Sequence, residues 1–243
     1  MDDTPARRPE TLLWWFALGF LGLIGLGTVL DIDVRLSQVF YHADASPRWF
    51  LSQTLPWRWL YTYGEYPAFL LAVGAAVVWG GGVWYRPWLR YRRACALFVL
   101  AVVLGSGVIV NGLVKPLWGR PRPKHTDLFG STRVYRPWWQ RGEIGGGRSL
   151  PSGHASMGYV LVASTAMVAS RRSPWRQRGV LAVGLLYGSL LGLTRIIQGG
   201  HFATDVLWSG CLMCALVAWL DWLWPASAGP PPLASQGSAG VSG

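Results

Sequence analysis

The residues that decide the fold read ACALFVLAVVLGSGVIVNGLV, from Ala94 to Val114. This stretch has 21 residues and no charged side chain. A helix that crosses a bilayer needs about 20 mainly apolar residues, so the stretch is long enough for one crossing. Arg92 and Arg93 stand before it, and Lys115 follows it directly. The sequence therefore predicts a membrane-spanning helix with cations at both ends.

Five further stretches share this apolar character. Thr11–Leu30 and Tyr66–Tyr85 are each free of charge over 20 residues. The other three are shorter and become long enough when a polar residue at one end is included: Ala155–Ser170, Gly179–Thr194 and Val206–Leu220. We therefore expect an all-α polytopic membrane protein with six transmembrane helices.

The composition supports a membrane protein and excludes other classes. Hydrophobic residues make up 51% of the 243 residues and charged residues only 14%, whereas soluble domains have about 25% charged residues. Disordered chains are poor in aromatic residues, and this chain has 16 Trp. Its three cysteines all fall in apolar stretches, which excludes a disulfide scaffold.

The basic residues predict how the chain lies in the membrane. The net charge is +11, from 22 basic and 11 acidic residues. Arg residues cluster in segments 1–10, 86–93 and 171–178, which the positive-inside rule places in the cytoplasm. The long loops 31–65 and 116–150 then lie outside, where their many Trp and Tyr side chains suit the membrane surface. Loop 116–150 is itself basic, so we expect its cations to serve another purpose.

The apolar stretches also divide the chain into regions. Residues 1–10 are expected to form a cytoplasmic N-terminus, and residues 11–66 the first helix with a long interfacial loop. Residues 67–224 hold the other helices and the polar patterns described next, and should form the functional core. Residues 225–243 are uncharged and rich in Pro, Ser, Gly and Ala, which predicts a disordered tail.

Five ionisable residues stand at the ends of predicted helices, where charge is costly and indicates function. Lys115 ends the third helix, His154 begins the fourth, and Arg195 ends the fifth. His201 and Asp205 begin the sixth. Because successive helices cross in opposite directions, we expect all five side chains in one layer at the outer membrane–water interface.

The first of three local patterns is KPLWGRPRP, residues 115–123. It places Lys115, Arg122 and a further Arg in a short loop stiffened by proline. Arg offers a planar fork to phosphate oxygens, and Lys offers a point charge. The alternative is a basic cluster beside the membrane that contacts lipid head groups.

The second pattern is PSGH, residues 151–154. Pro and Ser suit the start of a helix, and Gly153 lets the backbone approach a ligand. Free N–H groups at a helix start bind anions. The alternative is an ordinary capped helix that carries His154 by chance.

The third pattern is TRIIQGGHFATD, residues 194–205. His201 and Asp205 are four residues apart and therefore share one helix face. A carboxylate beside an imidazole fixes its tautomer and stabilises its cation. The alternative is a polar pair that only caps the helix.

A metal centre is the main chemical alternative to an anion site. His154, His201 and Asp205 carry side chains that bind several metals. The three cations expected nearby would repel a metal ion and attract an anion. The sequence therefore predicts an anion site that needs neither a metal nor another cofactor.

Taken together, the three patterns resemble the signature motifs of the type 2 phosphatidic acid phosphatase superfamily. Order and spacing both match: Lys115-x6-Arg122-Pro123, Pro151-Ser152-Gly153-His154 and Arg195-x5-His201-x3-Asp205. The resemblance covers the second half of the chain, while the first two predicted helices match only as generic membrane segments. The family usually has Ser where this chain has Thr194, which keeps the hydroxyl.

The resemblance implies how a phosphate group would be bound. Lys115, Arg122 and Arg195 would hold the phosphate oxygens. Ser152 would add its hydroxyl and Gly153 its backbone N–H as further donors.

The resemblance also implies the catalytic roles. His201 would attack phosphorus and become a phosphohistidine, and Asp205 would orient it. His154 would protonate the leaving oxygen and then activate the water that hydrolyses the intermediate.

These roles imply a bacterial membrane lipid phosphatase acting on a phosphate monoester or diphosphate. Its partners would be the membrane and a lipid phosphate, with no role for nucleic acid. Undecaprenyl diphosphate, phosphatidylglycerophosphate, phosphatidic acid and lipid A all fit, and the sequence does not choose among them or give the oligomeric state. In a Gram-negative host the protein would lie in the inner membrane with its active site facing the periplasm.

Two alternatives use the same residues differently. A phosphotransferase would pass the phosphoryl group from His201 to a lipid acceptor and release no free phosphate. A non-enzymatic anion or lipid transporter would use the cations and would not need His201.

Overall fold

The computed structural model describes residues 9–166 and 174–225, and this part of the chain is all helical. A single isolated bridge between Thr126 and Arg133 is its only strand-like pairing. The expected all-α class is thus confirmed for the described residues. Most of the expected cytoplasmic N-terminus, part of loop 171–178 and nearly all of the expected tail lie outside them.

The described elements are helices of different lengths and types. The α-helices are α1 (Pro9–Val29), α2 (Ile32–Val39), α3 (Trp57–Tyr63), α4 (Tyr66–Gly81), α5 (Arg92–Leu100), α6 (Lys115–Trp118), α7 (Gly153–Tyr159), α8 (Pro174–Ile197) and α9 (Ala203–Leu223). Between them lie the π-helical segment η2 (Ala101–Val114) and the 3-10 helices η1 (Arg86–Tyr91), η3 (Pro123–His125), η4 (Asp127–Phe129) and η5 (Val160–Ala166).

Four segments of the described chain are long and apolar enough to cross a membrane. They are Glu10–Val29, Arg86–His125, Trp175–Ile197 and Ala203–Leu223. The sequence predicted six crossings. Of the two other stretches, α4 has 16 residues and ends at Gly81, within the glycine run 80–82. The other, α7 with η5, is described only as far as residue 166. The count of six stays a prediction.

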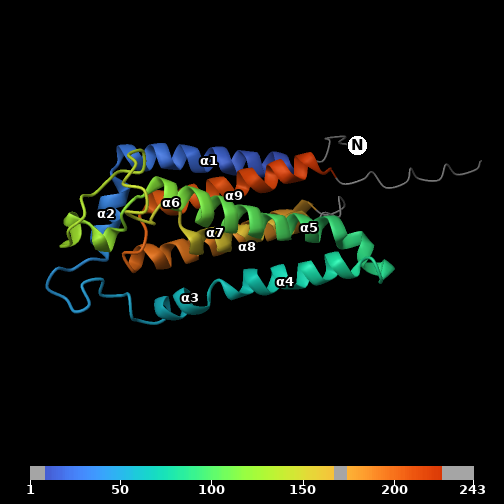
Figure 1. Cartoon of the computed structure of the whole chain (residues 1–243), viewed down its shortest axis with the longest axis horizontal. Helices are drawn as coiled ribbons and strands as arrows, with labels where there is room; N and C mark the ends of the chain where they lie inside the picture. Colours follow the sequence, from blue (N-terminus) through green and yellow to red (C-terminus); the bar gives the residue numbers. More distant parts are fainter. Residues whose placement is uncertain (1–8, 167–173, 226–243) are drawn as a thin grey trace, which may run out of the picture.

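The long helices lie side by side and alternate in direction along the longest axis of the molecule (Figure 1). α1 and α9 pack against each other, and α4 packs on α5. The short helices α2, α3 and α6 gather at one end, and the described chain begins and ends at the other. Loop 31–65 is therefore not a plain loop, since it contains two helices at this end.

Small residues bring α7 and α8 into close contact. A Cβ atom on Gly158 would lie 2.6 Å from the Cα of Gly188, which only glycine avoids. Because the two helices run in opposite directions, their close packing brings the start of α7 next to the end of α8. His154 and Arg195, far apart in sequence, thereby reach the same end of the bundle.

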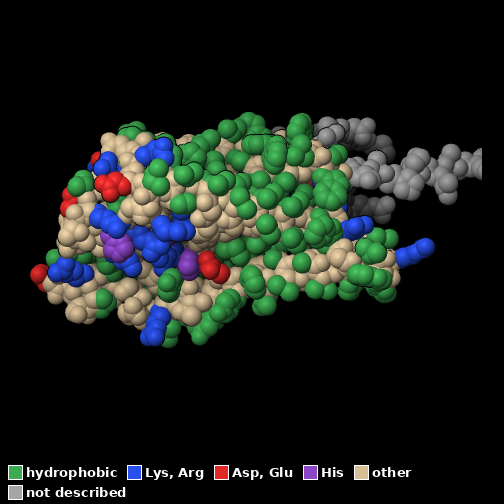
Figure 2. Space-filling model, in the orientation of Figure 1, with side chains coloured by type: hydrophobic (Ala, Val, Ile, Leu, Met, Phe, Trp, Pro, Cys, Tyr) green, Lys and Arg blue, Asp and Glu red, His purple; other side chains and the backbone are tan. Residues whose placement is uncertain are grey.

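The surface divides into an apolar middle and a polar end. Figure 2 shows hydrophobic side chains over the long helices, with Lys, Arg and His side chains gathered at the end that carries α2, α3 and α6. Many large apolar side chains of α1 and α4 are exposed, including Leu18 and Leu70. Such extensive exposed apolar surface fits contact with lipid, and we call the end with α2, α3 and α6 the polar end.

Labelling of single cysteines tests which side of the membrane the polar end faces. Leu128 at the polar end and Leu89 at the opposite end are each 47% exposed, and the chain's own three cysteines are buried. In spheroplasts of an expressing bacterium we expect Leu128→Cys to react with a membrane-impermeant maleimide. Leu89→Cys should react only after permeabilisation, because the Arg-rich loops are retained in the cytoplasm. The opposite labelling pattern would place the polar end inside.

Candidate active site

The three sequence patterns meet at the polar end of the bundle. Ser152 donates its backbone N–H to the carbonyl oxygen of Asp205 at 3.1 Å, which joins the second pattern to the third. A Cβ atom on Gly153 would lie 2.8 Å from the Lys115 Nζ, so the first pattern reaches the second at a position where glycine leaves room for the ammonium group. The structure thus places side chains from α6, α7 and α9 together.

Two cations of the predicted site are buried and each is held by a neighbouring amide. The Lys115 Nζ donates to the Asn111 Oδ1 at 2.8 Å, and the Arg195 guanidinium donates to the Gln198 Oε1 at 2.5 Å. The guanidinium also lies 4.5 Å from the centre of the Tyr61 ring. The Arg195 Nε is buried without a hydrogen-bond partner among the described residues, so it remains available to a ligand.

The third cation and the serine of the predicted site have different surroundings. Arg122 is half-buried and, like Lys115 and Arg195, acts electrostatically on His154. Ser152 is buried and caps α7, since its Oγ accepts a hydrogen bond from the backbone N–H of Ala155 at 3.4 Å. Its hydroxyl therefore already stabilises the helix start whose N–H groups were expected to face an anion.

His154 is held by the junction between α3 and α4. Its Nδ1 lies 3.2 Å from the Glu65 Oε1, and its Nε2 lies 3.3 Å from the carbonyl oxygen of Tyr61. The ring stacks on the Tyr61 ring at 5.1 Å and 12°. Burial and the nearby Arg195 lower the pKa of His154 to about 4, so the ring is neutral at pH 7 when no anion is bound.

His201 is buried just before α9. Its Nδ1 lies 3.6 Å from the Asp205 Oδ2, slightly beyond hydrogen-bond distance, and has no hydrogen-bond partner in the described part of the chain. Burial lowers the pKa of His201 to about 3, outweighing the opposite effect of Asp205. The imidazole is therefore neutral at pH 7, and a neutral imidazole has a lone pair for nucleophilic attack.

The Asp205 side chain accepts three hydrogen bonds. Its Oδ2 accepts from the Ser149 Oγ at 2.5 Å and from the backbone N–H of Phe202 at 2.8 Å. Its Oδ1 accepts from the Arg120 guanidinium at 2.5 Å. These bonds fix the carboxylate that faces His201.

Arg120 is completely buried and lies between two carboxylates. Besides Asp205, it donates to the Asp33 Oδ2 at 2.7 Å and to the Thr204 Oγ1 at 3.0 Å. Its Nε donates to the carbonyl oxygen of Arg136 at 2.9 Å. The guanidinium therefore connects α2, the loop after α6 and the start of α9. It is bonded within the protein and is not directed toward a phosphate group, as the cations of its pattern were expected to be.

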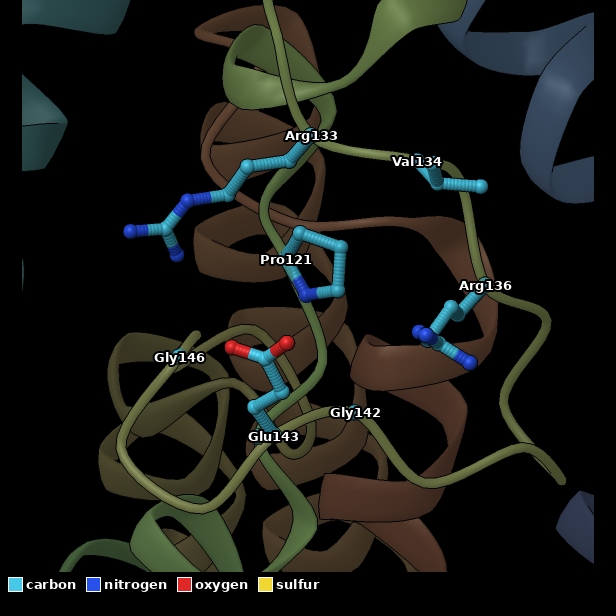
Figure 3. A pocket seen from close by; sticks show the side chains of 8 residues that line it. Pro121, Arg133, Val134, Arg136, Gly142, Glu143 and Gly146 are labelled. Carbon is cyan, nitrogen blue, oxygen red and sulfur yellow. The ribbon is translucent and has the colours of Figure 1, made fainter.

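A pocket of about 240 Å³ lies over the backbone on either side of Arg120 (Figure 3). It is lined by Gly119, Pro121, Arg133, Val134, Arg136, Gly142, Glu143 and Gly146. Figure 3 shows the Glu143 carboxylate pointing toward Pro121, with Arg133 and Arg136 on opposite sides of it. The pocket carries charges of both signs and is open to solvent.

The possible metal ligands do not form a metal centre in the described residues. No group of three or more His, Cys, Asp or Glu side chains is arranged there to hold a metal ion. Asp205 is instead bonded to Arg120, and His154 lies against Glu65 and Tyr61.

Comparison with known proteins identifies the family. The family model of the PAP2 superfamily matches residues 96–229. The chain belongs to this superfamily. The resemblance predicted from the three motifs is thereby confirmed, and the matched segment runs from α5 through α9.

A curated relative of this PAP2 chain is the lipid A 4'-phosphatase of Francisella tularensis subsp. novicida strain U112. It is 32% identical over 123 residues, which cover 50% of this chain and 54% of the relative. The chain thus matches about half the length of that relative. No solved structure matches the chain.

Several residues of the candidate site could not be found by sequence reasoning. Asp33, Tyr61 and Glu65 come from a region expected to be an interfacial loop, before the family segment begins. Arg120 lies within the first motif but was counted only as one more loop cation. Thr194, expected to replace the family's Ser without change, donates its hydroxyl to the carbonyl oxygen of Leu190 within α8 at 3.0 Å.

Removal of Arg120 should destabilise the PAP2 chain strongly. Arg120→Met keeps most of the volume but leaves two buried carboxylates without their cation, a loss of about 3–5 kcal/mol of unfolding free energy. Chemical unfolding in detergent, followed by Trp fluorescence, measures this loss. Arg133→Met is the matched control, because Arg133 is exposed and should tolerate the change within about 0.5 kcal/mol. Equal stability of the two variants would contradict the buried ion pairs.

Proposed function

We propose that this PAP2 chain is an integral-membrane lipid phosphatase that hydrolyses a phosphate monoester or diphosphate of a lipid. The observation that carries the proposal is the buried His201, which lies 3.6 Å from Asp205 and experiences the charges of Lys115 and Arg195, at the polar end of an apolar bundle. Phosphoryl transfer depends mainly on positioning and on stabilisation of negative charge, and both are supplied here by fixed side chains.

Lys115, Arg122 and Arg195 hold the phosphate oxygens in this proposal. The unpartnered Arg195 Nε supports the assignment, because a buried N–H donor gains a partner when a phosphate oxygen arrives. Ser152 and Gly153 add a hydroxyl and a backbone N–H from the start of α7. The proposed site uses no metal, since the cations neutralise the charge that a metal ion would otherwise neutralise.

The reaction proceeds in two steps. In the first, the His201 Nε2 forms a bond to phosphorus while the bond from phosphorus to the leaving oxygen breaks, and that oxygen takes a proton from His154. In the second, His154 removes a proton from water, the water oxygen bonds to phosphorus, and the N–P bond breaks to release inorganic phosphate. Asp205 orients the His201 ring and stabilises its positive charge in the intermediate.

Glu65 and Tyr61 determine how His154 takes part. Burial raises the pKa of Glu65 and lowers that of His154, so the free site favours a neutral histidine. A bound phosphate offsets the cations that repel a proton from His154, and the Glu65 carboxylate at Nδ1 then stabilises the protonated ring. The leaving oxygen takes the place of the Tyr61 carbonyl at Nε2.

The proposed location follows from the apolar bundle and its charges. The chain crosses the bacterial inner membrane six times, and its active site lies at the outer membrane–water interface facing the periplasm. Lipid A is favoured among the candidate substrates, because the matched relative is a lipid A 4'-phosphatase. A lipid substrate can reach such a site from the plane of the membrane.

Phosphate release from lipids tests this function directly. Purified protein in detergent should release inorganic phosphate from at least one of lipid A, phosphatidic acid, phosphatidylglycerophosphate and undecaprenyl diphosphate, with EDTA present. Vanadate, a phosphate mimic, should inhibit. His201→Ala should abolish release, whereas His125→Ala, a change at an exposed histidine without an assigned role, should retain it.

Three results would contradict the proposal. The first is no release from any lipid of the panel. The second is loss of release in EDTA that a divalent ion restores, which would reassign the histidines as metal ligands. The third is transfer of phosphate to a lipid acceptor without free phosphate, which would indicate a phosphotransferase.

A further inference from the structure

Asp33 is an acidic residue buried in a place that the family segment does not cover. It lies on α2, is 5% exposed, and precedes the matched residues 96–229 by many positions. Its Oδ1 accepts from the backbone N–H of Thr204 at 2.8 Å. Its Oδ2 accepts from the Thr204 hydroxyl at 2.6 Å and from Arg120 at 2.7 Å. Asp33 thus contacts the residue before Asp205 and the guanidinium that binds Asp205.

The buried group formed by Asp33, Arg120 and Asp205 has one negative charge in excess. Tyr135 also faces this group but adds no charge, because burial, the largest effect, raises the pKa of its hydroxyl to about 12. An uncompensated negative charge is costly away from water unless a positive charge lies beside it. His201 lies beside this group, with its Nδ1 3.6 Å from the Asp205 Oδ2. It is neutral in the free site and can supply a positive charge during the reaction.

We propose that Asp33 is a positioning residue that keeps Asp205 effective as the anionic partner of His201. The proposal rests on the lipid-phosphatase function proposed above. As the His201 Nε2 bonds to phosphorus, its ring becomes positively charged, and the excess negative charge next to it stabilises that charge. Without Asp33, the positive charge of Arg120 would be balanced by Asp205 only. The excess negative charge that stabilises the positively charged His201 ring would then be lost.

The stabilisation acts on the reaction step and not on substrate binding. Lys115 and Arg195 also face His201, but the bound phosphate offsets them. Asp33 contacts Arg120 and Thr204, and neither residue belongs to the proposed phosphate-binding set. Loss of its charge should therefore lower kcat and leave KM nearly unchanged.

The test compares Asp33→Asn with Asp31→Asn in the full-length protein. Asn keeps the size of the side chain and one oxygen acceptor for the backbone N–H of Thr204. It removes the charge and puts an amide NH2 in place of the Oδ2 that accepts from Arg120 and the Thr204 hydroxyl. Asp31 is the matched control, since it stands two residues away and is exposed. We expect Asp33→Asn to reduce kcat about 10- to 100-fold, by analogy with the loss of a hydrogen-bond partner behind a metal-binding residue. KM should change less than about threefold, and Asp31→Asn should resemble the wild type.

A second variant separates this role from a purely structural one. Arg120→Gln combined with Asp33→Asn restores one excess negative charge, carried by Asp205 alone. We expect the double variant to turn over faster than Asp33→Asn, because the charge facing His201 returns. If Asp33 only braced the fold, removal of a second buried partner would slow the enzyme further, and that result would overturn the proposal.

The remaining outcomes are also decisive. Unchanged kcat in a folded Asp33→Asn variant, or a loss confined to KM, would overturn the inference while the wild type and Asp31→Asn still released phosphate. Absence of phosphate release in the wild type would instead refute the proposed function. If Asp33→Asn does not fold, the double variant is compared with the wild type instead. A kcat of the double variant more than about tenfold below that of the wild type would overturn the proposal.

Discussion

A guanidinium buried between two carboxylates organises the polar end of this protein. Arg120 binds Asp33 on α2 and Asp205 on α9, and its own segment follows α6. Each charge is out of water, so the two carboxylates are stable only while Arg120 stays between them. The arrangement joins three segments that are far apart in sequence. It also fixes Asp205 beside His201, so the geometry of the proposed nucleophile depends on it.

The helix bundle explains why charge is found at this end. Apolar side chains along the middle face lipid, and a charged side chain there would be costly. Lys115, Arg195 and Asp205 avoid that cost, because each stands at or near the terminus of a helix. Close packing of α7 on α8 then brings the termini together. Burial lowers the pKa of both histidines. In the proposed mechanism His201 stays neutral for its attack, and the bound phosphate favours protonation of His154 alone.

Much of this arrangement could be predicted from sequence, and the rest depends on contacts that leave no local pattern. Long apolar runs predicted the main helices and the five ionisable residues at four of their ends, and motif order and spacing predicted the family. Helices α2 and α3 were missed, because both are short and lie between turn-rich segments. Asp33 and Glu65 were missed because each acts through a residue far along the chain. The shortness of α4 reflects a glycine run inside an apolar stretch.

The central claim is that His201 carries the phosphoryl group during turnover. It is tested most directly by mixing a nitrophenyl phosphate ester with His154→Ala, in which hydrolysis of the intermediate should be slow, and quenching in base, where phosphohistidine survives. Mass spectrometry of the digested protein should then find phosphate on the peptide that contains His201. Phosphate on another residue, or no phosphopeptide while nitrophenol is still released in a burst, would contradict the account.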